Sequence, residues 1–572
     1  MQESSDQPVN QRAESRSRSG TGASRRSFLK GIGAAALTST VPLKVLAPGI
    51  SQAREIATRA SKLNAGEDPN QRRTVALKIR TRAAHDEFSV PLPDHSNNGD
   101  EDFYPNRIGS FSKGLQHDAN GEVEASAYAA LLTAVTTGNP SDFAAIPLGG
   151  TVPLVNPQAG LAFDLEGTDS GQLSIPPAFS LASPERAAEM VELYWQAVLR
   201  DLPFSEYGAD SDAAAAISEL DGLAAFTGPK KNGHVTAGTL FRGFTAGDVI
   251  GPYISQLLCQ PLAYGAMPSG QQYKTELPLS NGGADYLITL PSWLDAQNGV
   301  KPFASSRPDS TPRFIRSGRD LGVYVHVDVA YQAFLDAALA LARAGAPLNP
   351  ANPYRNSTNQ TGFVTFGLPH LHVLLAEVCA RAFKAVWYQK WFIHRTVRPE
   401  AYGGLVHLTS TGVKNYPVDA TVLHSTGLAK VFARNDTYLL PMGYPEGCPQ
   451  HPSYAQGHAA VVGASATVLK WFFDETVVIP NPMVASNDGL TLNPYTGSDR
   501  DEITVGGEVD KLASNIGIGR DFAGVHWRSD YTEALLLGQA IAISVLADQQ
   551  NLYNENFNGA TLTTFDGTRI TV

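Results

Sequence analysis

Apolar residues recur at steps of three and four over much of the chain, and long segments rich in proline, glycine and asparagine separate these stretches. This spacing is typical of amphipathic helices that bury one face. It predicts helices at 184–202, 212–222, 241–262 and 325–344. In the last of these the half-buried face holds Val329, Phe334, Ala337, Leu341 and Ala344.

Patterns typical of β-strands are few. A strand is predicted at 286–290, and the final residues, ATLTTFDGTRITV, alternate around Asp566-Gly567, a pair that favours a hairpin turn. The sequence therefore predicts a mainly α protein built of packed helix bundles, with long loops and a small C-terminal β-hairpin. Because structureless loops beyond ~15 residues are uncommon, we expect these loops to serve function or subunit contacts.

Composition limits the classes of function. The chain has 572 residues, of which 43% are hydrophobic and 17% charged, so it can bury a large core. A net charge of −11 argues against nucleic-acid binding, which needs a basic face, and an anion site must be a local cluster of cations. Cys259, Cys379 and Cys448 lie far apart, which excludes a disulfide framework or a zinc site and allows one bridge at most.

The N-terminus resembles a twin-arginine export signal. Polar residues 1–24 lead into SRRSFLK at 24–30, an apolar segment follows, and Ser51-Gln-Ala53 fits a small-x-small cleavage site. We therefore expect 1–53 to be an export signal with a disordered start, and the folded protein to reach the periplasm or the medium. The alternative is a chance basic and apolar stretch. No other segment approaches the ~18 apolar residues of a spanning helix, so we expect no stable membrane insertion.

Three segments in the last third carry candidate chemistry. The first, QKWFIHRTVRP at 389–399, ends a helical pattern that starts near Leu371. Continuing its apolar face in steps of four gives Lys390, His394 and Arg398, so a buried stripe becomes cationic. Pro399 disfavours helix at Arg398. The side chains of Lys390 and Arg398 can then converge on one site. The alternative is a basic helix end exposed to solvent.

The second segment, HPSYAQGHA at 451–459, leads into an apolar helical run with small residues. The first turn of such a helix has unpaired backbone N–H groups that bind oxyanions, and Gly457 lets a ligand approach the backbone. His458 would stand beside the anion as an acid or base. The alternative is a capping glycine beside a surface histidine.

The third segment is GRDFAGVHWRSD at 519–530. His526 and Asp530 are four residues apart, a spacing that places two side chains together on a helix. The carboxylate can accept the Nδ1 proton and leave Nε2 bare for a ligand. Arg520 can add a cation, and Gly524 weakens the case for a regular helix between them. The alternative is a structural His–Asp pair.

Together the three segments supply three cations, one helix-start amide and two histidines. This set predicts a pocket for a phosphate-like or vanadate-like oxyanion. Guanidinium groups would grip its oxygens through charge-assisted hydrogen bonds, and a neutral imidazole would face the central atom.

The combined pattern, Lys-x7-Arg-Pro, Gly-His and Arg-x5-His-x3-Asp, resembles the shared signature of vanadium-dependent haloperoxidases and type-2 acid phosphatases. The bromoperoxidase type is the nearer match, through KWFIHRTVRPEAYGG, HPSYAQGHAAVVGAS and IGIGRDFAGVHWRSDYTEALLLG. The resemblance covers most of the chain after about residue 70. It implies two four-helix bundles with the site in the core of one. We divide the chain into 54–350, a helical part with oligomerisation loops, and 351–572, a vanadate-binding bundle with the hairpin.

Carried over by residue, the resemblance implies that His526 binds vanadium through Nε2 and that Asp530 orients this imidazole. The vanadate oxygens would be held by Lys390, Arg398 and Arg520.

The helix-start segment completes the implied site. Gly457 would donate a backbone N–H to the anion, His458 would be the acid–base group, and His451 would tune protons or the approach of halide. The family usually has serine before the Gly-His pair. Here that position is Gln456, whose amide either donates to the anion or turns away.

The implied activity is oxidation of bromide, iodide or chloride by hydrogen peroxide to hypohalous acid, which halogenates small organic acceptors. One vanadate per subunit would act as a Lewis acid. Three cysteines and five methionines offer an oxidant few targets. The resemblance also implies a homodimer or larger homo-oligomer, and a structural calcium in some relatives, to which the sequence assigns no ligands.

Two other functions fit the same pocket. In an acid phosphatase, His526 would attack phosphorus and His458 would protonate the leaving alcohol. In a noncatalytic exported oxyanion-binding protein, Gln456 would mark a decayed site.

Overall fold

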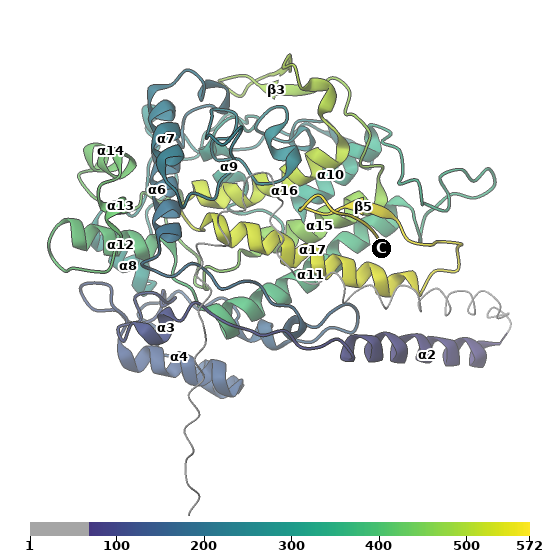
Figure 1. Cartoon of the computed structure of the whole chain (residues 1–572), viewed down its shortest axis with the longest axis horizontal. Helices are drawn as coiled ribbons and strands as arrows, with labels where there is room; N and C mark the ends of the chain where they lie inside the picture. The colour runs from purple at the N-terminus through teal and green to yellow at the C-terminus, as the bar shows by residue number, and fades with distance from the viewer. Residues whose placement is uncertain (1–67) are drawn as a thin grey trace, which may run out of the picture. The chain divides into compact units, whose positions relative to one another are not determined.

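The structure is a computed structural model that describes residues 68–572. This part of the chain is mainly helical with small antiparallel strand pairs, which confirms the predicted fold class (Figure 1).

The helices before residue 350 are α2 (Pro69–Phe88), α3 (Asp100–Phe103), α4 (Ala125–Thr137), α5 (Pro140–Ala144), α6 (Pro184–Val198), α7 (Ser211–Gly222), α8 (Leu290–Asn298), α9 (Gly318–Tyr324) and α10 (Gln332–Arg343). Those after it are α11 (Leu368–Tyr388), α12 (Pro399–Ser410), α13 (Ala420–Leu423), α14 (Thr426–Asn435), α15 (Gly457–Phe472), α16 (Val505–Phe522) and α17 (Arg528–Gln550). The strand pairs are β1 (Leu262–Tyr264) with β2 (Met267–Ser269), β3 (Met483–Ala485) with β4 (Leu492–Pro494), and β5 (Thr561–Thr563) with β6 (Arg569–Thr571).

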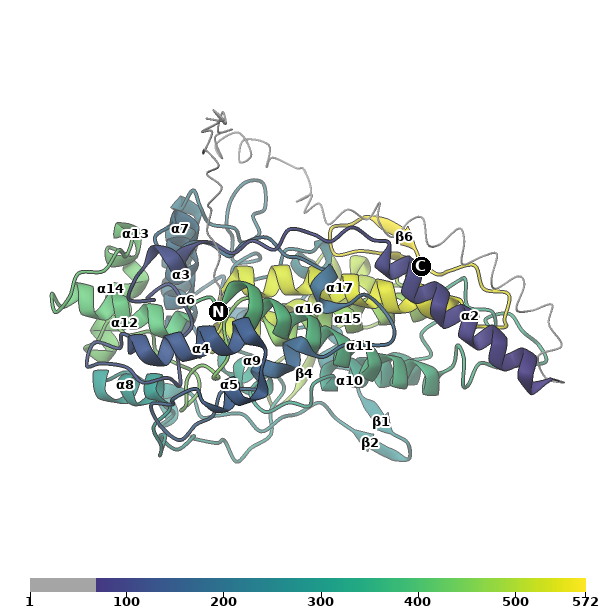
Figure 2. The same ribbon diagram turned by 90° about the horizontal axis from the view of Figure 1, so that it is seen from below.

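Helices α11, α15, α16 and α17 form a four-helix bundle with α15 in its core (Figures 1 and 2). Every residue of α15 except His458 is buried. Glycines let α15 and α17 approach closely. A Cβ atom on Gly463 would lie 2.3 Å from the Leu535 carbonyl oxygen, and one on Gly538 would lie 1.9 Å from that of Ala460. Because no side chain fits there, the two backbones pack directly against each other.

Helix α17 is long and apolar enough to cross a membrane, by length and composition alone. Its most apolar window has a mean hydropathy of 1.2, and 72% of that window is buried inside the protein. Since α17 packs on α11, α15 and α16, its apolar surface is covered by the bundle. The helix therefore has the character of a core helix.

A second helical group forms around α6, which packs on α7, α13 and α14 (Figure 1). The Ser183 hydroxyl caps α6 by accepting from the Arg186 backbone N–H at 3.1 Å, and Pro184 occupies the first turn, where no N–H is needed. The predicted helices 184–202 and 212–222 are confirmed to within a few residues as α6 and α7.

The predicted helix at 241–262 is wrong. The segment forms only short 3-10 turns at Ala246–Val249 and Gln256–Leu258 before β1 begins. Phe241 and Gly251 have φ angles of +56° and +70°, and Pro252 follows directly. A left-handed residue and a proline each interrupt an α-helix. Most of its apolar residues are buried all the same, because the loop packs on α16, and Val249 is an exception at 43% exposure.

The predicted helix at 325–344 is right only in its second half. Helix α10 starts at Gln332, and the preceding residues form turns after α9. Val329 and Ala344, both expected on the buried face, are exposed, whereas Phe334, Ala337 and Leu341 are buried as expected.

The strand predicted at 286–290 is also wrong. Tyr286 makes one isolated antiparallel bridge with Met442, Leu287 has a φ angle of +57°, and Leu290 already begins α8. The C-terminal hairpin is confirmed, because β5 and β6 pair across the predicted Asp566-Gly567 turn.

The proposed export signal at 1–53 lies outside the described residues, as does 54–67. The division of the remainder at residue 350 stays a prediction. All three cysteines are described, and each is buried and unpaired.

Candidate active site

The first cationic segment, 389–399, is not the regular helix that the sequence predicted. It still brings Lys390 and Arg398 to the predicted anion site. Helix α11 continues into a π-helical turn at Gln389–His394, and Arg395 then takes a left-handed conformation with a φ angle of +38°. Arg398 therefore lies on no helical stripe with Lys390. It is the extended N-cap residue of α12, which begins at Pro399, so Arg398 is outside the helix, as the following proline predicted. His394 is buried without a hydrogen bond to either ring nitrogen among the described residues. Burial lowers its pKa to about 3, so it adds no charge.

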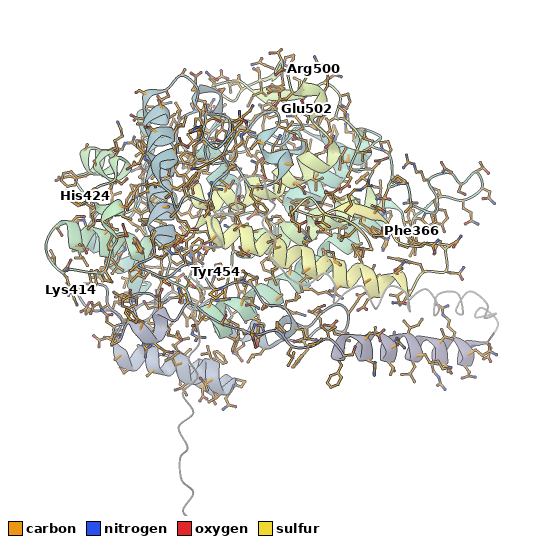
Figure 3. All side chains as sticks on the ribbon, viewed as in Figure 1. Phe366, Lys414, His424, Tyr454, Arg500 and Glu502 are labelled. Carbon is orange, nitrogen blue, oxygen red and sulfur yellow. The ribbon has the colours of Figure 1, made fainter. Side chains whose placement is uncertain are left out.

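The ammonium group of Lys390 is fully buried beside the segment that leads into α15. Its Nζ donates to the carbonyl oxygens of Pro452 and Ser453, both at 2.7 Å. The next residue, Tyr454 (labelled in Figure 3), is itself buried and anchors this segment by donating to the Pro176 carbonyl. Burial lowers the pKa of Lys390 well below its usual value, and the charge of Arg398 lowers it further.

Arg398 lies between two of the predicted histidines. Its Nη1 is 3.0 Å from His526 Nε2 and donates to the Val525 carbonyl at 2.7 Å. Its Nη2 is 3.0 Å from His451 Nδ1, and both Nε and Nη2 donate to the His451 carbonyl. Because a guanidinium can only donate, the facing His526 Nε2 must be an unprotonated acceptor. His451 Nδ1 lies between this donor and the Pro452 carbonyl, an acceptor at 3.2 Å.

Arg520 comes from the last turn of α16. Its Nη1 donates to the Val325 carbonyl at 2.6 Å, and its guanidinium lies 5.1 Å from the centre of the Tyr444 ring. Its Nε is buried with no hydrogen-bond acceptor in the part of the chain that the structure describes. The charge of Arg520 lowers the pKa of Lys390 and of His526. Arg520 is therefore close enough to share one site with Lys390 and Arg398.

The three cations are not balanced by contacting carboxylates. Within residues 68–572, none of Lys390, Arg398 and Arg520 has a carboxylate oxygen within 4.0 Å, whereas buried Arg200 lies 2.6 Å from Asp285. Buried charges in proteins are normally paired, because an isolated charge loses its hydration without compensation. The site therefore has an excess of positive charge that fits an anion.

His526 is oriented by Asp530, as predicted, although the two do not share a regular helix. Gly524 has a φ angle of +78° and separates α16 from α17, so His526 lies just before α17 and Asp530 lies in its first turn. His526 Nδ1 lies 2.7 Å from the Asp530 carboxylate, which also accepts from the Ser453 hydroxyl. Burial lowers the pKa of His526 well below its usual value, and Arg398 adds to this effect. The neutral imidazole thus carries its proton on Nδ1 and presents a lone pair at Nε2.

His458 is the more accessible histidine. It lies in the first turn of α15, its side chain is 29% exposed, and its Nε2 lies 2.9 Å from the Asp328 carboxylate. Burial alone would raise the pKa of Asp328, but the charge and hydrogen bond of His458 outweigh it, so this pKa is lower than usual. A partly exposed imidazole that is hydrogen-bonded to a carboxylate is suited to general acid–base chemistry.

His451, Gln456 and Gly457 surround the start of α15. His451 is buried, its ring centre lies 4.8 Å from that of Trp387, and burial keeps its pKa well below the usual value. Gly457 is the first helical residue, as predicted. The Gln456 amide donates to the Gly517 carbonyl of α16 at 3.1 Å, while its Oε1 is buried without a partner among residues 68–572.

Known proteins resemble this chain in sequence and in fold. The family model of the VCPO second helical-bundle domain matches residues 370–555. The vanadium-dependent bromoperoxidase of Corallina pilulifera is 36% identical, over 85% of this chain and 93% of its own, and that of Ascophyllum nodosum is 35% identical, over 85% and 90%. The solved homohexameric second vanadate-dependent bromoperoxidase of Ascophyllum nodosum matches with a TM-score of 0.81 and 31% identity, over 88% of this chain and 90% of that one.

This chain belongs to the vanadium-dependent haloperoxidase family. It is therefore an enzyme of the class that the sequence resemblance implied.

Sequence reasoning missed two contributors to the haloperoxidase site. Asp328, the partner of His458, lies 130 residues away in a segment predicted as helix, and no local pattern marks it. Ser453, which donates to Asp530, stands within a quoted motif and has no spacing that would single it out.

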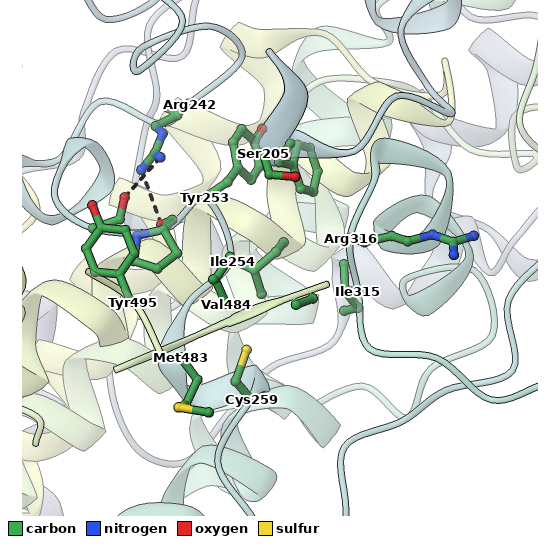
Figure 4. Close-up of a pocket in the computed structure, with 14 residues that line it drawn as sticks. Ser205, Arg242, Tyr253, Ile254, Cys259, Ile315, Arg316, Met483, Val484 and Tyr495 are labelled. Carbon is green, nitrogen blue, oxygen red and sulfur yellow. Dashed lines mark hydrogen bonds between the residues drawn. The ribbon is translucent and has the colours of Figure 1, made fainter. Parts of the chain in front are cut away.

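A cavity of about 320 Å³ lies elsewhere in the haloperoxidase (Figure 4). It is lined by apolar residues such as Ile254, Ile315 and Val484, with Arg242 and Tyr495 at one side, and it contains none of the predicted site residues. In the described part of the chain, no three His, Cys, Asp or Glu side chains gather as a metal site. The structural calcium that the resemblance allowed stays unassigned.

Proposed function

We propose that this protein oxidises halide with hydrogen peroxide, using vanadate held by the site described above. The single observation that carries the proposal is the convergence of three buried cations without carboxylate partners beside a neutral imidazole. A tetrahedral oxyanion supplies the missing negative charge, and the guanidinium of Arg398 suits its oxygens.

The residues fit vanadate in particular through His526. Its Nε2 lone pair suits coordination to a metal centre, and the carboxylate on Nδ1 is a common partner of metal-binding histidines. Lys390, Arg398 and Arg520 would hold the oxygens, with the Gly457 backbone N–H at the helix start. When bound, vanadate supplies a Lewis acid that activates peroxide for attack by halide.

The protein's own groups manage charge and protons. Asp530 fixes the His526 ring and its tautomer. His458 can hold a proton at Nε2 in the hydrogen bond to Asp328 and pass it to or from peroxide on the open side of the site. Lys390, buried and fixed by two carbonyls, presents its remaining N–H to the anion and polarises the oxygen there. His451 remains a proposed influence on protons and halide.

An assay of bromide oxidation with hydrogen peroxide, with and without added orthovanadate, tests the proposal. Oxidation that requires vanadate and disappears in His526→Ala supports it. Hydrolysis of phosphate esters without vanadate-dependent oxidation would instead indicate the phosphatase function. Neither activity, with vanadate still bound, would indicate a noncatalytic oxyanion-binding protein.

We infer that the protein acts as a homo-oligomer. The Ascophyllum nodosum structure similar to this chain is described as homohexameric. In addition, the β1–β2 hairpin projects from the helices (Figure 2), and its Tyr264 and Met267 are 41% and 68% exposed. Light scattering on the purified full chain should give a mass of at least two subunits, and a monomer at micromolar concentration would contradict this.

We further infer export by the twin-arginine route, which rests on the sequence at 24–53 alone. Fusion of residues 1–53 to a reporter should direct it across the membrane, and Arg25→Lys with Arg26→Lys should retain it inside. Export unaffected by the double substitution would refute this route.

A further inference from the structure

Three buried charged residues follow one face of α6 at steps of three. Arg186, Glu189 and Glu192 are at most 2% exposed. Arg186 Nη1 donates to Glu189 at 2.7 Å, and its Nη2 donates to the Phe179 carbonyl at 3.0 Å. We call these three residues the α6 ladder. Their spacing places them on one side of the helix, where they can contact a single partner element.

The partner is the start of α17, and each member of the ladder contacts one of three consecutive residues there. The Arg186 guanidinium lies 4.1 Å from the centre of the Trp527 ring. Glu192 accepts from Arg528 through both carboxylate oxygens, one of them 2.8 Å from Nε. Glu189 accepts from the Ser529 backbone N–H at 2.7 Å.

These three residues fill the gap between His526 and Asp530. The Trp527 backbone N–H donates to the Asp530 carboxylate at 3.2 Å, next to the 2.7 Å contact with His526. The Trp527 indole donates to the Val397 carbonyl, one residue before Arg398. A shift of the first turn of α17 would therefore move the His526 ring and disturb its contact with Arg398.

Stability gives no sufficient reason for this arrangement. Buried ion pairs contribute little net stability, because desolvation offsets their attraction, and apolar residues of similar size often do as well. What they supply is direction, since a bidentate carboxylate and a stacked guanidinium tolerate only a narrow range of orientations.

We propose that the α6 ladder is a positioning element for the vanadate-binding imidazole, in which Arg186, Glu189 and Glu192 hold the start of α17 so that His526 Nε2 points at the anion. The inference rests on the proposed function of the site. It gives α6, which carries none of the predicted site residues, a part in cofactor binding that acts through the start of α17.

The test uses the full-length protein and orthovanadate. Glu192→Gln keeps the shape of the side chain and removes the charge that orients Arg528. Partners of metal-binding histidines typically affect affinity by 10–100-fold. We expect the vanadate dissociation constant, measured by equilibrium dialysis, to rise by about 10-fold or more, and the 51V NMR signal of the bound anion to shift. Arg186→Lys, which keeps the charge but loses the stacked plane, should show a smaller effect in the same direction.

Asp510→Asn is the matched control. Asp510 is a buried carboxylate paired with Lys470 at 2.7 Å on the same bundle, ten residues before Arg520 in the sequence. Urea unfolding should show that this variant and Glu192→Gln are similarly destabilised, while the control keeps wild-type vanadate affinity and 51V signal. Ladder variants that bind within twofold of wild type, or a control that loses as much affinity as they do, would overturn the proposal.

A different set of results would show that the proposed function itself is wrong. If wild-type protein binds no vanadate, or His526→Ala binds it equally well, the vanadate site itself is wrong. If wild type binds and His526→Ala does not, but the ladder variants are unaffected, only the positioning role is wrong.

Discussion

Replacing Lys390 by methionine separates a lysine that serves an anion from one that serves the fold. The substitution preserves the apolar stem and removes an ammonium group that is buried, hydrogen-bonded to two carbonyls at 2.7 Å and unpaired with any carboxylate in the described chain. Lys113 provides the contrast. It is also buried, but its Nζ lies 2.7 Å and 3.0 Å from the two oxygens of Glu400.

The expected magnitudes follow from these contacts. Without vanadate, Lys390→Met leaves two carbonyls short of a donor, which costs about 1–3 kcal/mol each. It also removes a buried charge whose desolvation costs several kcal/mol. The two effects oppose each other, so the free energy of unfolding should change by no more than about 2 kcal/mol. Lys113→Met instead leaves the buried Glu400 carboxylate without its cation and, in the described chain, with hydrogen bonds from Gln297 and the Cys448 N–H alone. This should cost about 3–5 kcal/mol.

For vanadate affinity, we expect the opposite order, with Lys390→Met the more damaging of the two substitutions. One hydrogen bond from a charged donor to the anion is worth about 1.5–3 kcal/mol, which corresponds to roughly a 10- to 150-fold rise in the dissociation constant for Lys390→Met. Lys113→Met should bind vanadate with wild-type affinity wherever it is folded. Calorimetric unfolding at several vanadate concentrations measures both quantities, because stabilisation grows as RT ln(1 + [L]/Kd).

The reasoning fails if the two lysines behave alike. A Lys390→Met protein that loses several kcal/mol without vanadate, yet keeps its vanadate affinity, would show that this ammonium group supports the fold. The positive charge of the site would then need another explanation.

His458→Ala should lower kcat for bromide oxidation by about 10²- to 10⁴-fold, as expected for loss of a general acid–base group, and raise the vanadate dissociation constant less than His526→Ala does. Steady-state kinetics and dialysis measure both, and equal losses of affinity would place His458 among the anion ligands. Burial lowers the pKa of His117 to about 4 and of His394 to about 3. The stability from these lowered values is present above the unfolded pKa of ~6.5 and is lost as the pH falls through the folded values, so urea unfolding should show stability declining from pH 6.5 toward pH 4. His394→Phe should flatten that decline, and an unchanged profile would contradict the assignment. Dithiothreitol should leave the Tm unchanged because the three cysteines are unpaired; a lower Tm would indicate a bridge.

The chemistry of the site was predictable because it lies in short local patterns. The helix that begins at Gly457, the lysine and arginine before Pro399, and the His526–Asp530 pair can each be identified within a dozen residues. The contacts that bring these three patterns together link residues far apart in the sequence. The His526–Asp530 contact was predicted correctly, but the two residues do not share a helix, because His526 lies before α17 begins at Arg528. The interruption at Gly524, where a regular helix was doubted, is present.

The wrong secondary-structure predictions and the missed contacts share a physical cause. At 241–262 and 286–290 the apolar residues are buried by loops that pack on the bundle, and such burial has no fixed period. Positive φ angles at Phe241 and Leu287, at non-glycine residues, could not be anticipated from residue type. Asp328 and the α6 ladder were missed because their partners lie more than a hundred residues away. Pattern methods detect periodicity along the chain, and these contacts depend on the tertiary fold.

The distribution of buried charge connects these observations. At the start of α17, the guanidinium of Arg528 lies against Glu192 at 2.8 Å, so that charge is neutralised within the protein. Around His526, the acceptors that residues 68–572 offer to Lys390, Arg398 and Arg520 are neutral. They are carbonyl oxygens, two imidazole nitrogens and the Tyr444 hydroxyl. Carbonyl dipoles fix the direction of a cation but leave its net charge in place. The protein can therefore hold these side chains in position before the anion arrives and still attract it strongly, which a carboxylate in the same place would prevent.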